Sequence, residues 1–204
     1  MNRNKQGHGS GSGNGSGGRS AVVESGGVVD VWATNLQSQF LVIEQLIKDY
    51  PFVAMDTEFP GVVARPIGTF KTANDYNYQT LRCNVDLLSI IQLGICFTDA
   101  QGNPPPAGLG ASTFQFHFKF SLENDMYAQD SIDLLTHSGI DFAKHNEIGI
   151  DPEEFGDIMT SSGLVLLDKV KWISFHSGYD FGYLLKVLTS GQLPPDENNF
   201  FGKF

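Results

Sequence analysis

Hydrophobic residues change their spacing along the first part of the chain, and each spacing predicts a different element. Over residues 32–50 the apolar positions recur three or four apart, which is typical of a helix with one buried face. A continuous apolar run then leads into two carboxylates and predicts a short buried strand over residues 52–58. A Pro-Gly pair at 60–61 ends this strand.

The middle of the chain has the plainest strand pattern. Helical spacing over residues 76–88 predicts a second helix, and an apolar run at 90–97 predicts a second buried strand. Between 114 and 120 every second residue is Phe and the residues between them are polar, which indicates a strand with one buried face. Residues 99–112 are rich in turn-forming residues, so these two strands are expected to be antiparallel.

Helices dominate the second half. One is expected from Asp130 to Gly139, and another over 151–163, where an Asp N-cap, a Pro and two acids form a strong helix start. Residues 170–175 predict a fourth strand, and 179–189 predict a helix that Gly191 ends. The order of helix, three strands, helices, strand and helix predicts one α/β domain over residues 27–204.

Composition separates a tail from this domain. Residues 1–26 are rich in Gly and Ser and are expected to be a disordered tail, with no apolar stretch that would make a signal peptide. The longest apolar stretch, 87–97, is too short to span a bilayer. The net charge of −10 argues against a broad basic surface for nucleic acid, although metal ions can bridge acidic side chains to phosphate. Two cysteines without metal-type spacing favour a reducing, intracellular compartment.

Asp56 and Glu58 are the first candidate site. Residues two apart on a strand point the same way, so both carboxylates lie on one side of the strand end. They repel each other unless a cation lies between them, and Mg²⁺ is typically held by one or two carboxylates. The alternative is a solvated strand end or a cap.

Asp180 is the second candidate, at a junction between a strand and a helix. It is either an acid favoured by the helix dipole or, if its strand neighbours the first strand, a third carboxylate beside Asp56 and Glu58. His176, just before it, is either a hydrogen-bonded residue or a base.

Other polar and surface positions leave two interpretations open. Arg65 and Lys71 belong either to a solvated loop or to a phosphate contact. Cys83 and Leu87, four apart on a predicted helix, either pack in the core or form part of a partner groove. His117 lies on the polar face of its strand and is expected to be incidental.

Four segments together resemble one known family. Val53–Gly61, Leu81–Leu88, Met126–Ser131 and Ser174–Leu184 closely resemble the Caf-type deadenylases, the catalytic subunits of the carbon catabolite repressor–Not complex, over residues 31–201. The resemblance implies a ribonuclease H-like fold of the DEDD exonuclease superfamily, with a mixed sheet flanked by helices. It also implies removal of adenylates from poly(A) RNA in the 3′-to-5′ direction with two Mg²⁺ or Mn²⁺ ions, in the nucleus and the cytoplasm.

The resemblance also assigns roles to residues. Asp56 and Glu58 match the family's first catalytic and metal-binding motif, and Asp180 matches its second. Cys83 and Leu87 match the region that docks the leucine-rich-repeat deadenylase subunit. Residues 155–163 fall near the face that meets the large Not scaffold subunit.

The resemblance is incomplete at the C-terminal end. The family's fourth metal-binding Asp and the His before it lie beyond Phe204, so the domain is expected to be C-terminally incomplete and its activity feeble. Phe200, Phe201 and Phe204 are expected to stay exposed. The alternative function is therefore an impaired fragment that acts only as a protein-interaction module of the deadenylase complex.

Overall fold

A computed structural model describes residues 27–202, so the predicted tail over residues 1–26 lies outside the described residues. The helices and strands follow in this order: β1 (Val28–Val31), α1 (Leu36–Asp49), β2 (Phe52–Glu58), α2 (Ala73–Leu87), β3 (Gln92–Thr98), the short 3₁₀ helix η1 (Ala107–Leu109), β4 (Thr113–His117), α3 (Gln129–His137), α4 (Phe142–Ile148), α5 (Pro152–Ser161), β5 (Lys171–Ile173), α6 (Gly178–Thr189) and α7 (Glu197–Phe201).

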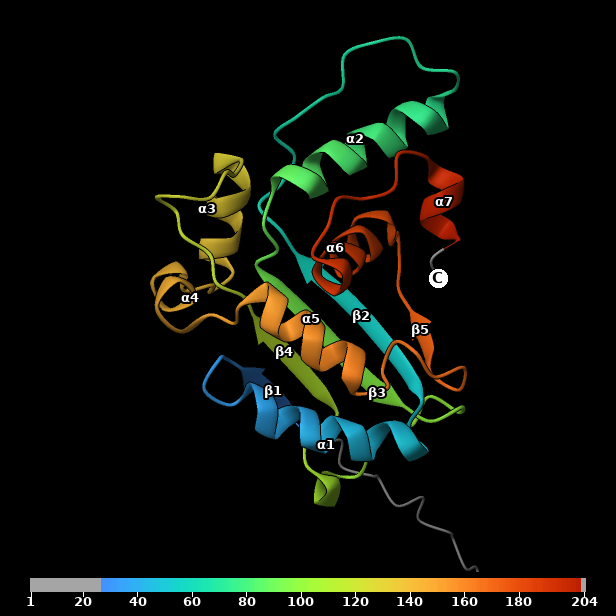
Figure 1. Cartoon of the computed structure of the whole chain (residues 1–204). Helices are drawn as coiled ribbons and strands as arrows, with labels where there is room; N and C mark the ends of the chain where they lie inside the picture. Colours follow the sequence, from blue (N-terminus) through green and yellow to red (C-terminus); the bar gives the residue numbers. More distant parts are fainter. Residues whose placement is uncertain (1–26, 203–204) are drawn as a thin grey trace, which may run out of the picture.

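The strands form one mixed sheet with the order β1-β4-β3-β2-β5 (Figure 1). β3 is antiparallel to both β2 and β4, whereas β1 is parallel to β4 and β5 is parallel to β2. The antiparallel pair expected from residues 90–97 and 114–120 is therefore confirmed. The mixed sheet flanked by helices is the expected fold class.

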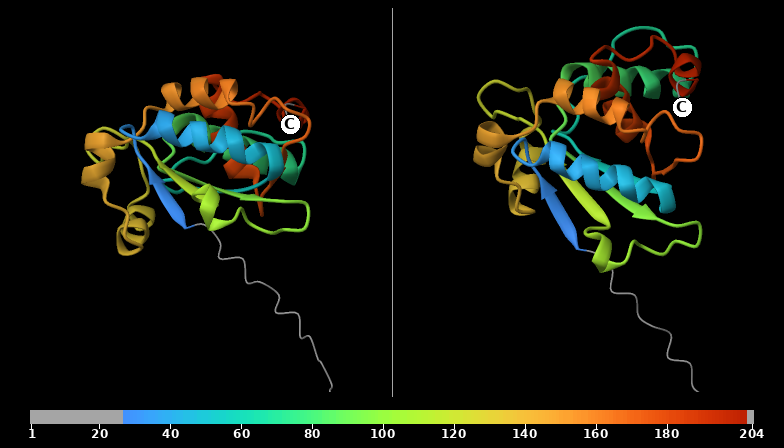
Figure 2. Two further views of the ribbon diagram at one scale, coloured as in Figure 1. Left: turned by 90° about the horizontal axis from the view of Figure 1, so that it is seen from below. Right: turned by 60° about the horizontal axis from the view of Figure 1, so that its bottom comes forward.

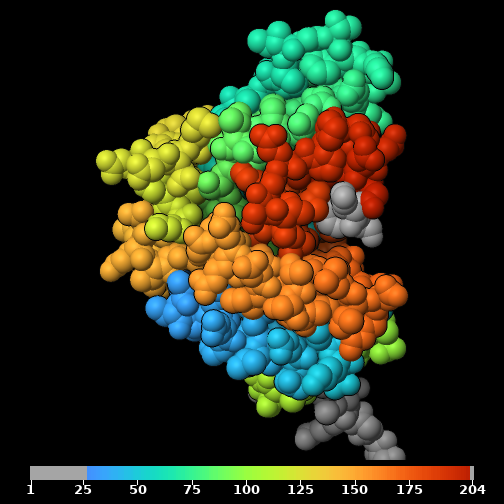
Figure 3. All heavy atoms as spheres, viewed as in Figure 1, coloured from blue at the N-terminus to red at the C-terminus, as the bar shows by residue number. Residues whose placement is uncertain are grey.

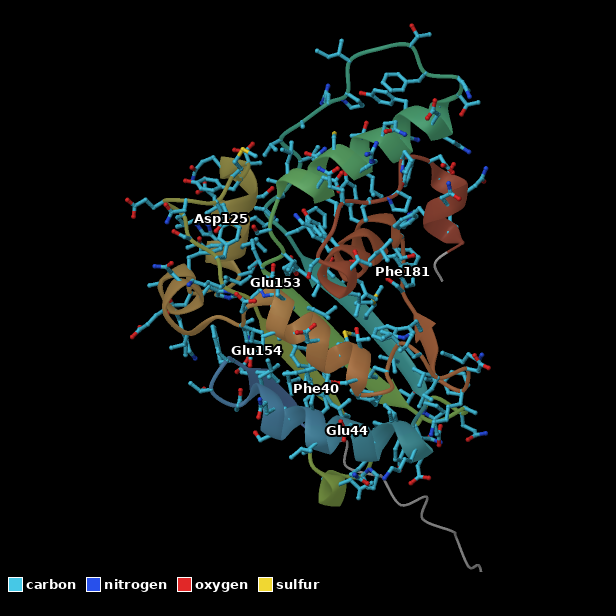
Figure 4. The ribbon with its side chains drawn as sticks, in the orientation of Figure 1. Phe40, Glu44, Asp125, Glu153, Glu154 and Phe181 are labelled. Atoms are coloured by element: carbon cyan, nitrogen blue, oxygen red, sulfur yellow. The ribbon has the colours of Figure 1, made fainter. Side chains whose placement is uncertain are left out.

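One face of the sheet is covered by α1, α5 and α6 (Figures 1 and 2). The alternating Phe side chains of β4 point to this face, and Phe114 and Phe116 have no exposed surface. Phe40 of α1 lies between its own helix and α5, where its ring meets those of Phe116 and Phe155 (Figure 4). α1 and α5 form adjacent bands over the sheet in the space-filling view (Figure 3). The prediction of core on one face of this strand is confirmed.

The opposite face of the sheet is largely open. Among residues 27–202 it is flanked by helices at one end, where α3 and α4 lie (Figure 2). On β2 the side chains alternate, with Val53, Met55 and Thr57 buried on the helix-covered side and Ala54, Asp56 and Glu58 exposed on the open side. The candidate carboxylates therefore belong to the open face.

Several element boundaries differ from the sequence prediction. α1 begins at Leu36 rather than at residue 32, because the Asn35 side chain accepts a hydrogen bond from the Trp32 N–H (2.7 Å) and forms a turn before the helix. α2 begins at Ala73, where the Thr72 hydroxyl caps the Asp75 N–H. β1, α4 and α7 were not predicted, since four to seven residues are too few to show a period.

The C-terminal prediction was wrong in part. Phe200 is 1% exposed because α7 places its ring against Tyr78, at 5.6 Å between ring centroids. Phe201 is 58% exposed, as expected, and Phe204 lies outside the described residues. After α6 the left-handed residue is Ser190 (φ 48°) rather than Gly191.

Cys83 and Cys96 are free thiols. Within residues 27–202 every helix is too short or too polar to cross a membrane.

A buried cluster of aromatic side chains closes the end of the sheet beside α4. The rings of Trp32 and His117 stack at 4.1 Å, and His145 of α4 meets both edge-on. His117 Nε2 bonds Asp30 Oδ1 (2.8 Å), and His145 Nδ1 bonds the Phe118 carbonyl (2.7 Å). With 8% of its surface exposed, His117 is not incidental, and that prediction was wrong. The sequence pattern missed it because the face opposite the Phe residues is covered here by Trp32 and α4.

These histidines make stability depend on pH. Burial lowers the pKa of both His117 and His145, so near pH 6.5 the folded chain binds these protons less readily than the unfolded chain. The free energy of unfolding is therefore expected to fall as the pH drops below about 6.5. In His145→Asn the amide replaces the Nδ1–H donor without titrating, so this fall is expected to be shallower. Urea unfolding at several pH values measures it, with the exposed His137→Asn as the control. The same pH slope in His145→Asn and the wild type would show that His145 does not contribute.

Candidate metal-binding site

The candidate site begins at the end of β2. Asp56 and Glu58 lie on the open face, and in the antiparallel pairing with β3 they stand opposite Gly94 and Gln92. Glu58 ends the strand, and its carbonyl accepts a hydrogen bond from the Ile91 N–H (2.9 Å). The two carboxylates therefore have rigid backbone positions, as the sequence predicted for a strand end.

Asp180 is brought to the same place by the first turn of α6. It is 6% exposed, and its Oδ1 accepts hydrogen bonds from the Thr57 N–H (3.0 Å) and the Thr57 hydroxyl (2.6 Å). No described residue donates a hydrogen bond to its Oδ2. The start of α6 is further fixed by Tyr179, whose ring stacks on Phe59 at 5.0 Å. Asp180 is thus hydrogen-bonded to Thr57, the residue that lies between Asp56 and Glu58 in the sequence.

The three carboxylates influence one another electrically. The pKa of Glu58 is raised, first by burial and then by the negative charges of Asp56 and Asp180. The charged form of Glu58 is therefore less favourable here than in water, and a cation beside it would offset the repulsion. Hard oxygen ligands of this kind suit Mg²⁺ and Mn²⁺.

The described residues supply only part of a metal site. No group of three or more His, Cys, Asp or Glu side chains within residues 27–202 is placed to hold one ion together. Asp180 bonds Thr57, whose side chain lies on the helix-covered side of β2, whereas Asp56 and Glu58 lie on the open side. Its Oδ2 has no hydrogen-bond donor among the described residues and is left for a ligand. The chemistry of Asp56, Glu58 and Asp180 fits a divalent cation, and their number leaves room for further ligands.

The other sequence candidates lie outside this contact network. Arg65 and Lys71 are exposed in the loop before α2, and no interaction joins either side chain to the carboxylates within the described residues. His176 has a left-handed backbone (φ 52°), and its ring meets that of Phe175 at 4.7 Å.

Cys83 and Leu87 share α2 but differ in environment. Leu87 is 51% exposed, so it is not a core residue, whereas the Cys83 thiol lies 3.2 Å from the Thr80 carbonyl. Between them Asn84 is fully buried and binds the loop through the Ala64 N–H and carbonyl. Asn84 and Thr57 were not predicted, because one polar residue in an apolar pattern does not reveal its partner.

Residues 155–163 lie on α5 and just after it. Phe155 and Met159 are buried against the core, and Asp157, Thr160 and Ser161 form the exposed surface. Glu153 and Glu154, in the first turn of α5, lie at the other end of this helix (Figure 4).

Comparisons with known proteins show which family this chain resembles. The model of the CAF1 family ribonucleases matches residues 31–152. The poly(A) ribonuclease pop2 of Schizosaccharomyces pombe is 57% identical over 172 residues, which make up 84% of this chain and 50% of that protein. The chain thus spans half the length of this relative.

Solved structures agree with the sequence relatives. The Mg²⁺- and Mn²⁺-bound form of S. pombe Pop2p is 56% identical and has a TM-score of 0.83, covering 86% of this chain and 68% of that one. The yeast NOT1 MIF4G domain co-crystallised with CAF1 gives 40% identity and a TM-score of 0.72, over 86% of this chain and 64% of that one. These matches confirm the expected ribonuclease H-like fold. The chain belongs to the CAF1 ribonuclease family.

Proposed function

We propose that this protein is a metal-dependent exoribonuclease that removes adenylates from the 3′ end of poly(A) RNA. The observation that carries the proposal is the attachment of Asp180 to Thr57, between Asp56 and Glu58. Membership of the CAF1 ribonuclease family and the name of the S. pombe relative, a poly(A) ribonuclease, support the same activity.

Asp56, Glu58 and Asp180 would hold two Mg²⁺ or Mn²⁺ ions, as the metal-bound form of the S. pombe neighbour supports. Such ions lower the pKa of a bound water and stabilise the leaving 3′-oxygen. The residues of this chain would position the two metal ions. Asp56 and Glu58 present carboxylates from a rigid strand, and Asp180 keeps its Oδ2 for a ligand while Thr57 holds its Oδ1.

The proposal extends to partners and location. The exposed surface of α2 around Leu87, with Cys83, would dock a leucine-rich-repeat deadenylase subunit. Residues 155–163 would meet a large Not scaffold, which the neighbour co-crystallised with a NOT1 domain supports. Such a protein would act in both the nucleus and the cytoplasm.

The interaction-module alternative is less well supported, because Asp180 is hydrogen-bonded to Thr57, next to Asp56 and Glu58, and the family match is to ribonucleases. It differs from the enzyme in one clear way, since an interaction module binds partners without shortening RNA.

A ribonuclease assay distinguishes the enzyme from the interaction module. With Mg²⁺ or Mn²⁺ we expect the 204-residue chain to shorten a 5′-labelled oligo(A) slowly, one nucleotide at a time. Asp56→Asn and Asp180→Asn are expected to reduce the rate at least about 10²-fold, because each removes a metal-binding carboxylate that acts in the transition state. The exposed Asp157→Asn on α5 serves as the matched control. Gel analysis of the products measures this, and no metal-dependent shortening by the wild type would contradict the enzyme.

Metal binding is tested without catalysis. Mn²⁺ at a hundredfold excess over its Kd is expected to raise the free energy of unfolding by about 2.7 kcal/mol. Asp56→Asn should remove most of this gain. In the metal-free protein at pH 7 the same variant is expected to be slightly more stable than the wild type. The reason is that the raised pKa of Glu58 marks a repulsion that Asp56 contributes. Because the pKa of Glu58 is raised, the folded protein already binds this proton above pH 4.5, and the difference should disappear as the pH falls to about 4.5. Thermal unfolding of the wild type and of Asp56→Asn measures these differences. If Mn²⁺ stabilises both proteins equally, Asp56 does not bind the metal.

A further inference from the structure

A cavity of about 380 Å³ lies on the open face of the sheet, beneath the turn that joins α3 to α4. Its aromatic wall contains the stacked rings of Trp32 and His117, and Lys144 lies over the Trp32 ring at 4.1 Å. Gln92 of β3 and Gln115 of β4 line it from the sheet. This volume is within the range of small-molecule sites, about 300–1,000 Å³.

Several polar groups of this wall lack partners. Gln92 is 8% exposed, and its side-chain amide forms no hydrogen bond with any residue in the described part of the chain. Beside it, Trp32 Nε1 and His117 Nδ1 are buried without a hydrogen-bond partner among the described residues. Buried polar groups are normally paired, so several unpaired ones around one cavity point to a ligand.

The cavity adjoins the candidate metal site. The strand register places Gln92 opposite Glu58 on one side and opposite His117 on the other, so these three side chains form a row across the open face. Cα atoms of such opposed residues are about 4.5–5.5 Å apart. Gly94 stands between Asp56 and Gln115 in the register, so position 94 puts no side chain between Asp56 and the Gln115 side of the cavity.

We propose that this cavity binds an adenine base of the RNA and that the Gln92 amide recognises the edge of that base. The proposal rests on the proposed ribonuclease function, which puts a phosphate of the RNA at Asp56 and Glu58. A glutamine amide presents a donor and an acceptor side by side, and it pairs with the 6-amino group and N7 of adenine. The corresponding edge of guanine offers two acceptors and does not match. His117 and Lys144 occupy the two faces of the Trp32 ring, so the base would pack against the edge of this aromatic wall.

The test measures the coupling between Gln92 and the adenine 6-amino group. Fluorescence anisotropy gives the Kd of the wild type and of Gln92→Met for nuclease-resistant hexamers of adenosine, of cytidine and of purine riboside, which is adenosine without the 6-amino group. Met keeps the length and volume of Gln and removes its amide, so the fold is preserved. Gln37→Ala, exposed on α1 behind the other face of the sheet, is the control.

We expect the wild type and the control to bind the adenosine hexamer about tenfold more tightly than the purine riboside hexamer. Gln92→Met should lose about tenfold on adenosine and nothing on purine riboside, so that the preference disappears. A preference that persists in Gln92→Met, or an equal loss on all three hexamers, would overturn the assignment. In either case metal-dependent shortening of oligo(A) by the wild type would leave the proposed function standing. A wild type that binds none of the hexamers and does not shorten oligo(A) would overturn both.

Discussion

The attachment of Asp180 to Thr57 is the interaction on which the candidate site depends. Two hydrogen bonds to one carboxylate oxygen join the start of α6 to the end of β2, across 123 residues of sequence. A buried carboxyl group without donors would be costly, so the two hydrogen bonds from Thr57 offset part of the cost of burying Asp180. The stacking of Tyr179 on Phe59 supports the same junction with apolar area. Strand, helix and carboxylates therefore form one rigid unit.

The two faces of the sheet have different roles: one packs against the core, and the other carries the candidate site. Apolar side chains on one face pack under α1, α5 and α6, and they account for most of the buried core. The other face presents Asp56, Glu58 and the cavity around Gln92 to solvent. Because residues on neighbouring strands line up across a sheet, the register aligns Asp56 and Glu58 with the proposed base pocket. A substrate strand lying over this face would meet both.

Sequence reasoning recovered what repeats with a period and missed what depends on a single contact. The alternating Phe residues of β4 and the carboxylates of β2 were predicted, since strand periodicity decides which face each residue occupies. His117 was misread because its polar face is covered by distant segments, and Phe200 because α7 folds back onto Tyr78. The hydrogen bonds of Thr57 with Asp180 and the unpaired amide of Gln92 likewise depend on three-dimensional placement, which no local sequence pattern encodes. Asp180 was a candidate from its place at a junction between a strand and a helix, and the family resemblance then gave it a metal-binding role.

The most direct test of this account replaces Thr57 and measures Mn²⁺ affinity by titration calorimetry. Thr57→Val keeps the shape of the side chain and removes the hydroxyl that donates to Asp180, whereas Thr57→Ser keeps the hydroxyl. If Thr57 positions Asp180 for metal, the Val variant should bind Mn²⁺ at least about tenfold more weakly. Its unfolding free energy should fall by about 1.5–3 kcal/mol, and Ser should restore most of both losses. Unchanged Mn²⁺ affinity in Thr57→Val would contradict the claim that this junction organises the site.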